Sequence, residues 1–437
     1  MQRIKSSQIM GENSMYKLRI ADQLLLEQLE AAGAVLIQGP KWCGKTTTAA
    51  QAAKSVLYMD WPRELERNLF LAEENPEALL EGDVPRLIDE WQLAPQLWDA
   101  ARFTVDRRGK PGQFIFTGSA VPKEKDKEKM FHSGAGRFDW ITMRPMSLWE
   151  SGDSTGNVSI TDLFDGAMPE GTSSIDLDRL AFLTCRGGWP GALTLSENAA
   201  LHVSRAYIKA VVNSDINRVD DVKRDPDLML RIIRSLARNQ GEQIPYTTIR
   251  ADVINNEKVQ LSDDTVESYV KVLKKIFLEE DMRAWNPNLR SKTAIRTTDT
   301  RYFVDPSIAT AALGLGPKDL INDLIDFGFY FETLAVRDLR VYADALDGEV
   351  FHYRDKNGLE CDAVLHRRNG SYGLIEIKIG GADNIEKGAK TLKDLASKID
   401  TTKMKAPSFM MVVTGIGQYA YRRPDGVCVV PIGCLKP

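Results

Sequence analysis

The chain has 437 residues, of which 43% are hydrophobic and 27% charged, and its net charge at pH 7 is −4. This length predicts two to four domains, and the balance is typical of a globular protein with several buried cores. No apolar run approaches the roughly 20 residues that a membrane span requires, and the N-terminal residues lack the apolar core of a signal peptide. We therefore expect a cytoplasmic protein with no membrane contact.

The five cysteines are scattered along the chain, and no two of them are spaced as in a CxxC motif. Neither a disulfide framework nor a zinc site is expected, and a reducing compartment fits this usage. Met15 is an alternative start, so residues 1–14 are expected to form a disordered leader. The cysteines are Cys43, Cys185, Cys361, Cys428 and Cys434.

Apolar segments alternate with helix-like segments between about residues 16 and 150. The run at residues 34–38 ends in Gly-Pro and predicts a buried strand, and residues 46–53 predict the helix after it. Because these strands are apolar throughout, they predict a parallel sheet with helices on both faces. Further strands are expected at residues 56–60, 86–90 and 113–119.

The turn between the first strand and its helix carries the pattern of a P-loop. Its glycines let the backbone wrap closely around phosphates, whose negative charge is stabilised by N–H groups at a helix N-terminus. Lys45 is expected to reach the β- and γ-phosphates of ATP, and the Thr46 hydroxyl to hold Mg²⁺. The expected nucleotide contacts are Gly39, Pro40, Lys41, Trp42, Cys43, Gly44, Lys45, Thr46 and Thr47.

Two adjacent carboxylates end the predicted strand at residues 86–90. Asp89 is expected to coordinate Mg²⁺, often through water, and Glu90 to polarise the water that attacks ATP. Ser119 ends the next strand and suits a polar sensor of the γ-phosphate, the alternative being a simple strand-ending turn. The P-loop and these carboxylates together predict a Mg²⁺-dependent ATPase.

Two further positions have both a functional and a purely structural interpretation. Arg137, in a glycine-rich loop, is placed to act as an arginine finger on the nucleotide of its own or a neighbouring subunit; the alternative is a surface arginine. Pro190, in Gly187-Gly188-Trp189-Pro190, is expected near the adenine, and the alternative is a helix kink.

Residues 222–304 predict three helices followed by two strands, the pattern of a winged helix-turn-helix. This segment carries 15 Lys and Arg residues against 12 Asp and Glu residues. Such an excess favours contacts with DNA phosphates, whereas a winged helix that binds protein remains the alternative. The basic residues expected to contact DNA are Lys271, Lys274 and Lys275 on the third helix, and Arg290, Lys292 and Arg296 between the strands.

The C-terminal segment predicts a helix that carries Glu332, a β-hairpin with Asp362 on its second strand, and a further strand with Glu376 and Lys378. Residues two apart in a strand face the same side. Cleavage of a phosphodiester needs carboxylates that hold Mg²⁺ and a cation that stabilises developing charge. Asp362 and Glu376 suit the first role, Lys378 the second, and Glu332 an outer ligand. The arrangement is similar to the PD-(D/E)XK nuclease core.

Together the motifs resemble a large group of prokaryotic AAA-type ATPases, in which an AAA domain with a lid and a winged helix is fused to a restriction-endonuclease-like domain of poorly defined role. The Gly-Gly-x-Pro motif is also similar to that of STAND-type signalling NTPases. One departure is Trp91, where the group usually has a smaller aliphatic residue. The implied α/β domains are a P-loop NTPase core at 16–170, a helical lid at 171–221, a winged helix-turn-helix at 222–310 and a PD-(D/E)XK nuclease-like domain at 328–437.

The leading hypothesis is an ATPase that uses ATP and Mg²⁺, and whose nucleotide state controls a DNA-binding and DNA-cleaving module. The alternative is a nucleotide-gated switch or scaffold, whose inactive nuclease-like domain binds a protein partner. Assembly into a homo-oligomer is left open, because AAA domains often form rings whereas STAND-like relatives can be monomeric.

Overall fold

A computed structural model of the protein describes residues 16–120, 135–217, 220, 222–254, 260–290 and 294–437. The expected leader at residues 1–14 lies outside these ranges. Within them, no helix is both long and apolar enough to span a bilayer. The chain divides into two compact units: the first ends at Arg144 and also includes residues 214–223 and 275–277, and the second comprises the remainder.

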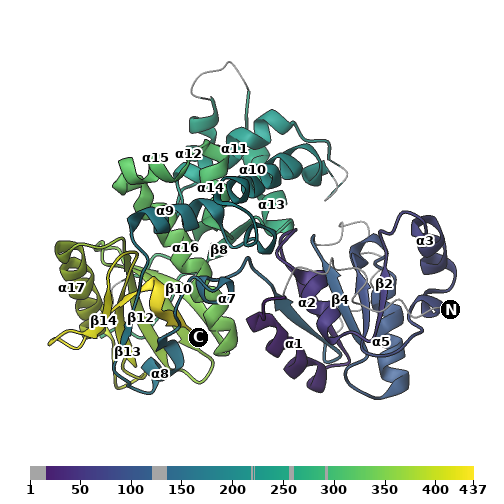
Figure 1. Ribbon diagram of the computed structural model, residues 1–437, viewed down its shortest axis with the longest axis horizontal. Helices are drawn as coiled ribbons and strands as arrows, with labels where there is room; N and C mark the ends of the chain where they lie inside the picture. Colours follow the sequence, from purple (N-terminus) through teal and green to yellow (C-terminus); the bar gives the residue numbers. More distant parts are fainter. Residues whose placement is uncertain (1–15, 121–134, 218–219, 221, 255–259, 291–293) are drawn as a thin grey trace. The chain divides into compact units, whose positions relative to one another are not determined.

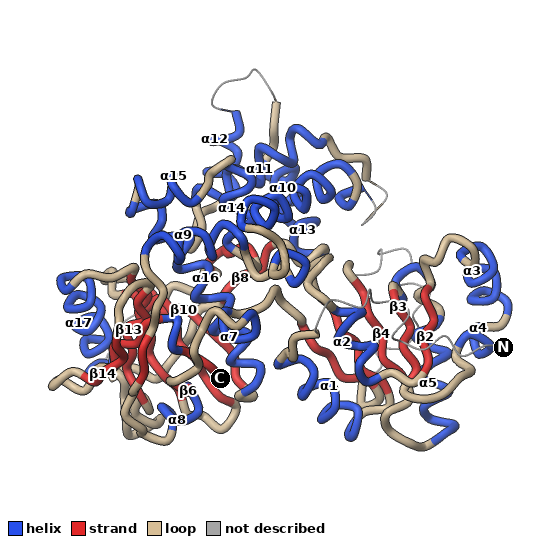
Figure 2. The backbone as a smooth tube through the Cα atoms, viewed as in Figure 1, coloured by secondary structure: helices blue, strands red, loops and turns tan. Residues whose placement is uncertain are grey.

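The first unit is built on a parallel five-stranded sheet in the order β2-β3-β4-β1-β5. This confirms the parallel sheet predicted from the continuous apolar strands. Figure 2 shows its strands with helices on both sides. The strands are β1 (Ala34–Gln38), β2 (Ser55–Tyr58), β3 (Arg86–Asp89), β4 (Phe114–Gly118) and β5 (Phe138–Thr142). The helices are α1 (Ile20–Ala31), α2 (Lys45–Ala52), α3 (Leu65–Glu74), α4 (Pro76–Leu79) and α5 (Leu97–Arg108).

Alternating residues of the central strands pack into two cores, one on each face of this sheet. Val35 and Ile37 of β1 pack with residues of α1 and α2, whereas Leu36 packs with Trp98 of α5. Because successive side chains of a strand point to opposite faces, β1 is apolar and buried at each of its first four positions. The two cores hold β1 between the helices on both faces of the sheet. The P-loop, which follows β1, is thereby positioned at the carboxyl edge of the sheet.

The helical part of the second unit contains the three helices and the two-stranded ribbon expected from the sequence. Asp225 accepts a hydrogen bond from the backbone of Asp227, and Pro226 opens the first of these helices. The ribbon is antiparallel and pairs Glu279 with Phe303. The elements are α9 (Leu177–Arg186), α10 (Glu197–Asn213), α11 (Pro226–Arg238), α12 (Tyr246–Ile254), α13 (Asp263–Lys275), β8 (Glu279–Met282), β9 (Thr300–Phe303), α14 (Pro306–Leu313) and α15 (Pro317–Asn322).

The C-terminal part is a seven-stranded mixed sheet in the order β10-β11-β12-β13-β15-β14-β7. The first three strands form antiparallel pairs, and the expected turn is present, with Gly358 at a φ of +85°. The long helices α16 (Leu324–Ala345) and α17 (Ala382–Lys398) lie on opposite sides of the sheet (Figure 1). The strands are β7 (Gly171–Thr172), β10 (Gly348–Arg354), β11 (Glu360–Arg367), β12 (Tyr372–Lys378), β13 (Phe409–Thr414), β14 (Tyr419–Arg422) and β15 (Cys428–Pro431).

The segment that follows the first unit belongs to this second unit. Its short strand β6 (Val158–Ser159) pairs with β16 (Leu435–Lys436), and β7 pairs with β14. The predicted ATPase core extended to residue 170. In the structure, residues 145–170 belong instead to the second unit, with the C-terminal sheet. Backbone pairing with strands more than 200 residues away in the sequence is the physical reason for this difference.

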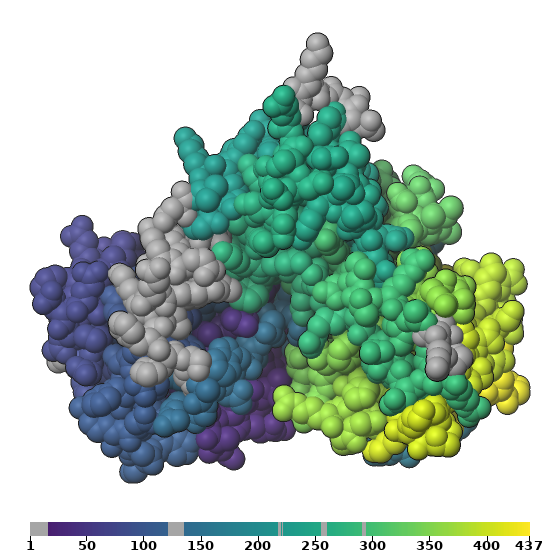
Figure 3. Space-filling model, turned by 180° about the vertical axis from the view of Figure 1, so that it is seen from behind, coloured from purple at the N-terminus to yellow at the C-terminus, as the bar shows by residue number. Residues whose placement is uncertain are grey.

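The chain between β8 and β9 lies along β10, the edge strand of the large sheet. Ala284 forms a bridge with His352, and Ile295 forms one with Asp355. Trp285 is buried in the core that contains residues of α17 and of the sheet, and its ring centroid lies 4.9 Å from that of Tyr372. Figure 3 shows this green segment lying over the yellow-green residues of the C-terminal part. The segment thus covers a sheet edge that would otherwise expose unpaired backbone groups.

Candidate functional site

The P-loop backbone has the curvature that phosphate binding requires. Gly44 precedes α2 with a left-handed φ of +102°. Gly39 has a φ of +153°, and a Cβ atom there would lie 2.0 Å from the carbonyl oxygen of Met143. Both positions therefore need glycine. Lys45, the first residue of α2, is buried, and its Nζ donates to the Pro40 carbonyl at 2.7 Å.

The two predicted magnesium residues of the P-loop site lie in direct contact. The Thr46 hydroxyl donates to Oδ1 of Asp89 at 2.7 Å, and the hydroxyl of Thr117 on β4 donates to the same oxygen. Burial raises the pKa of Asp89, and these two hydrogen bonds oppose that shift. A hydroxyl and a carboxylate are hard oxygen donors that fit Mg²⁺, whose other ligands are usually phosphate oxygens and waters.

Glu90 follows Asp89 and has a left-handed φ of +55°. Its Oε2 accepts a hydrogen bond from Ser119 at 3.2 Å and another from Nε2 of Gln92. Ser119 is thus brought to the site as a partner of Glu90, and its expected role as a sensor of the γ-phosphate stays a prediction. Gln92 was missed by the sequence reasoning, and its only signal was its position two residues after Glu90.

Two basic residues, one within the P-loop and one before α1, make contacts that the sequence did not indicate. Lys41 forms an ion pair with Asp215 at 2.5 Å, so its ammonium group is engaged by a carboxylate. The buried Arg19 donates from Nη1 to the carbonyl of Cys43 at 2.9 Å and from Nη2 to that of Arg144 at 2.9 Å. Arg19 therefore ties the loop to the chain that follows β5.

Arg137 does not lie near the P-loop of its own chain. It immediately precedes β5, and its carbonyl accepts a hydrogen bond from Ala34, the first residue of β1. The P-loop follows the other end of β1, about 15 Å away for a strand of this length. Its guanidinium pairs with Asp106 at 2.9 Å. Parallel pairing thus puts Arg137 at the amino edge of the sheet. Its expected role as an arginine finger, in its own or a neighbouring subunit, stays a prediction.

The Gly187-Gly188-Trp189-Pro190 motif forms a packing junction within the second unit. A Cβ atom on Gly188 would lie 2.1 Å from the Met146 carbonyl oxygen. The Gly188 N–H donates to Asp305 at 2.9 Å, and the buried Trp189 donates to Ser307 at 2.9 Å. Pro190 opens a short 3₁₀ turn, and its predicted contact with adenine stays a prediction.

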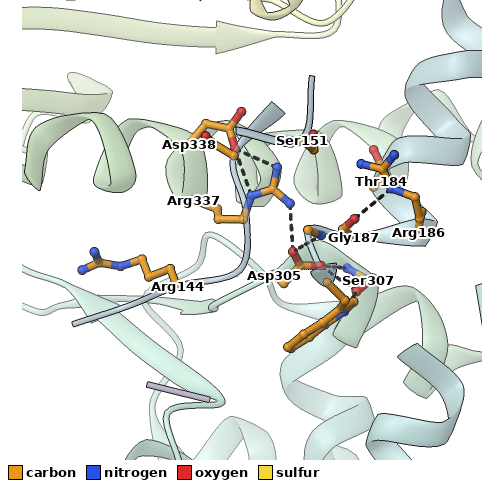
Figure 4. A network of polar contacts seen from close by, with 12 residues as sticks. Arg144, Ser151, Thr184, Arg186, Gly187, Asp305, Ser307, Arg337 and Asp338 are labelled. Atoms are coloured by element: carbon orange, nitrogen blue, oxygen red, sulfur yellow. Dashed lines mark hydrogen bonds and ion pairs between the residues drawn. The ribbon is translucent and has the colours of Figure 1, made fainter. Parts of the chain in front are cut away.

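A buried ion network adjoins this junction (Figure 4). Arg337 on α16 donates to Asp305 at 2.8 Å and to the neighbouring Asp338 at 2.7 Å. The second carboxylate oxygen of Asp338 accepts from the backbone of Leu148 at 3.0 Å. These contacts join α16, the start of α14 and residues 187–188, so the network ties the helical part to the C-terminal sheet.

The three predicted nuclease residues come together on β11 and β12. Lys378 Nζ lies 2.9 Å from Oδ2 of Asp362 and 2.8 Å from Oε2 of Glu376. The backbone N–H of Ile377 also donates to Asp362 at 2.7 Å. Burial and the charge of Asp362 raise the pKa of Glu376, and the two carboxylates raise the pKa of Lys378 against its burial.

Glu332 on α16 completes this group of charges. Burial raises the pKa of its carboxyl, and the charge of Asp362 raises it further, whereas Lys378 and a hydrogen bond from Tyr302 lower it. In the described part of the chain, no three His, Cys, Asp or Glu side chains converge as a ready metal site. Lys378 lies between the two carboxylates, and Glu332 is hydrogen-bonded to Tyr302. The donor set itself, all carboxylate oxygens, is of the kind that Mg²⁺ prefers.

Most of the basic residues expected to contact DNA have partners within the chain. Lys271 pairs with Glu267 at 2.9 Å, and Lys274 pairs with Asp281. Arg290 donates from Nε to the Ile399 carbonyl at 3.0 Å. Lys275 also has a partner. The backbone N–H of Arg296 donates to the Arg354 carbonyl at 2.8 Å. Lys292 lies outside the described residues.

Three family models match successive parts of the chain. Residues 31–151 match one described as an AAA domain. Residues 177–319 and 327–435 match two described as domains of unknown function, DUF8612 and DUF4143. With the P-loop geometry above, the first match identifies an AAA-type P-loop ATPase fold in the N-terminal part of the chain.

Distant relatives match most of the chain. Two uncharacterised proteins, one of Mycobacterium bovis and one of Mycobacterium tuberculosis, are each 23% identical over 376 residues, which is 85% of this chain and 76% of theirs. The structure of the Walker-type ATPase PABY2304 of Pyrococcus abyssi covers 67% of this chain and 94% of its own, with 13% identity and a TM-score of 0.41. The Aeropyrum pernix ORC1 protein in complex with DNA covers 71% and 95%, with 13% identity and a TM-score of 0.26.

Proposed function

We propose that this chain is a Mg²⁺-dependent ATPase whose nucleotide state controls a DNA-binding and DNA-cleaving C-terminal module. The observation that carries the ATPase assignment is the contact between the Thr46 hydroxyl and Asp89 at 2.7 Å, at the same sheet edge as Lys45 and Glu90. These are the groups that hold Mg²⁺, phosphate and water in P-loop enzymes.

Each residue of the P-loop site has a defined part in this proposal. The phosphates of ATP lie against the N–H groups at the start of α2, and Lys45 moves from the Pro40 carbonyl to the β- and γ-phosphates. Thr46 and Asp89 hold Mg²⁺, which neutralises charge developing on the phosphate oxygens. Glu90, held by Gln92 and Ser119, orients the attacking water.

The ATPase assignment is tested by steady-state phosphate release from the purified full-length chain, with and without DNA. We expect Lys45→Ala to abolish turnover and Glu90→Gln to slow it by roughly 10²-fold or more while ATP still binds. Lys54→Ala, an exposed lysine just after α2, is the control. Unchanged turnover in both site variants would refute these roles.

The proposed DNA module combines the helical part and the C-terminal sheet. Three helices followed by an antiparallel ribbon support a winged helix, and Asp362, Glu376 and Lys378 on adjacent strands support a PD-(D/E)XK-like site. If this is correct, Mg²⁺-dependent nicking of a plasmid is lost in Asp362→Ala and Lys378→Ala. Lys393→Ala, which breaks an ion pair with Asp425 in the same domain, should nick like the wild type.

A second candidate function is a nucleotide-gated switch or scaffold whose nuclease-like domain binds a protein partner without cutting. The pairing of Lys271 and Lys274 with acidic neighbours favours it, because these lysines are less available to phosphates. This candidate predicts ATP binding with very slow turnover, no stimulation by DNA and no nicking. Stimulation by DNA, together with nicking that depends on Lys378, would exclude it.

A further inference from the structure

Tyr302 on β9 reaches from the ribbon into the group of charges around Asp362. Its hydroxyl donates to Oε1 of Glu332 at 2.5 Å, and its side chain is fully buried. The ribbon belongs to the proposed winged helix, whereas Glu332 belongs to α16 of the nuclease-like part. One residue of the ribbon therefore takes part in the candidate nuclease site.

The position of Tyr302 is fixed by contacts on several sides. It pairs with Glu280 across the ribbon, and the carbonyl of Glu280 accepts a hydrogen bond from Arg340 at 3.1 Å. The Arg340 guanidinium also lies over the Tyr302 ring, 5.7 Å from its centroid. Arg340 is on α16, two turns after Glu332, so the same helix holds both the tyrosine ring and its hydrogen-bond acceptor.

A glycine turn closes the same side of the Glu332 carboxylate. Gly241 has a left-handed φ of +75°, and a Cβ atom there would lie 2.8 Å from Oε1 of Glu332. The Gly241 N–H donates to the Arg301 carbonyl, next to Tyr302, at 3.0 Å. Oε1 is thus enclosed by Tyr302 and Gly241. No hydrogen bond to Oε2 is found among the residues that the structure describes.

We propose that Tyr302 is a positioning residue that orients the Glu332 carboxylate as a third oxygen donor for a divalent cation held by Asp362 and Glu376. A carboxylate that binds a metal through one oxygen commonly has its other oxygen hydrogen-bonded, and this restricts its rotation. Cation entry displaces Lys378 Nζ from between the other two carboxylates. The inference rests on the metal-binding part of the proposed function and not on cleavage.

The experiment measures Mn²⁺ binding to the nucleotide-free full-length protein by isothermal titration calorimetry. The binding lost in Asp362→Asn defines the contribution of this site. We expect Tyr302→Phe, which removes only the hydroxyl, to weaken that binding about 10-fold. The matched control is Tyr372→Phe on β12, which also removes the hydroxyl of a buried tyrosine. The Tyr372 hydroxyl donates to the Lys405 carbonyl at 2.7 Å and not to a carboxylate of the candidate site. It should bind Mn²⁺ like the wild type.

A double-variant comparison tests whether Tyr302 acts through Glu332. If it does, Glu332→Gln weakens Mn²⁺ binding, and adding Tyr302→Phe weakens it no further. Equal Mn²⁺ affinity in Tyr302→Phe and wild type, or the same loss in Tyr372→Phe, overturns the inference. So does an Asp362→Asn variant that binds like wild type, because no cation site then exists there. Mn²⁺ binding that depends on Tyr302 without any nicking supports the inference and refutes only the proposed cleavage.

Discussion

Gln92 and Ser119 donate hydrogen bonds to the same carboxylate oxygen of Glu90. A non-glycine residue with a left-handed backbone, as Glu90 has, persists in that conformation only where neighbouring groups hold it. We predict that Gln92→Ala lowers kcat about 10-fold with little change in KM, because the water-orienting carboxylate loses one of its two donors.

The measurement is ATP turnover over a range of ATP concentrations. Gln23→Ala on α1, which removes an exposed glutamine paired with Glu27, is the matched control. A Gln92→Ala variant with an unchanged kcat would show that Ser119 alone positions Glu90.

Glu279 on β8 is a fully buried carboxyl whose two oxygens accept no hydrogen bond within the described residues. Burial raises the pKa of Glu279 from 4.5 to about 8, although the charge of Lys274 opposes the shift. The folded state therefore binds the proton more tightly than the unfolded chain. The stability that this contributes is fully present below pH 4.5 and is lost as the pH rises to about 8.

We predict that Glu279→Gln removes this pH dependence. At pH 9 the variant should exceed the wild type in free energy of unfolding by about 1–3 kcal/mol, because an ionised carboxylate is no longer buried. Urea unfolding at pH 5, 7 and 9 measures the difference. A variant that is less stable than the wild type at pH 9 would mean that Glu279 is ionised and well paired in the native protein.

At the scale of elements, the ion network around Arg337 joins α16 to the start of α14. Its side chains are almost completely buried: those of Arg337 and Asp305 are 1% and 0% exposed. Removing one member of a buried ion network leaves the others charged and unpaired. We predict that Arg337→Leu lowers the free energy of unfolding of the second unit by about 3–5 kcal/mol, measured by urea denaturation.

The control for this prediction is Arg354→Leu on β10, which breaks a more exposed ion pair with Glu360 at 2.8 Å. That change should cost about 1 kcal/mol or less, because water screens the pair. Similar losses in the two variants would mean that the buried network adds no stability beyond that of a surface ion pair.

The sequence predicted the elements whose signals are local. The continuous apolar strands of the first unit, the P-loop and the Asn357-Gly358 hairpin were all found in this way, because each depends on a few adjacent residues. The two-residue strands β6 and β7 were not, since they are too short to show any periodicity and take their partners from the C-terminal strands. Elements that exist only through distant pairing leave no local pattern.

The residues of the candidate sites can also be divided into those with a local signal in the sequence and those that depend on distant contacts. Lys45, Thr46, Asp89 and Glu90 follow from motifs beside strand ends. Asp362, Glu376 and Lys378 follow from charged positions within two predicted strands. The contacts of Arg19 with Arg144 and of Tyr302 with Glu332 join positions 125 and 30 residues apart, and nothing near either residue indicated its partner. Whether Arg137 acts on the nucleotide of its own or of a neighbouring subunit was left open, because a sequence does not show at which edge of the sheet a loop lies.

At the scale of the whole molecule, the position of Arg137 bears on assembly. Since parallel pairing puts it at the amino edge of the sheet, it can act on a nucleotide only if another copy of the chain brings that nucleotide to it. We propose this arrangement and predict that Arg137→Ala lowers turnover by roughly 10²-fold or more. Arg107→Ala on α5, where the guanidinium lies over Phe103, is the control.

Mixing two inactive variants distinguishes an action between copies from a loss of fold. An Arg137→Ala copy keeps an intact P-loop, and a Lys45→Ala copy keeps an intact arginine. If the arginine acts across an interface, a mixture hydrolyses ATP well above the sum of its parts, because each mixed interface contains one complete site. If the mixture gives only that sum, or if Arg137→Ala is fully active, then Arg137 is a surface residue whose role is its ion pair with Asp106.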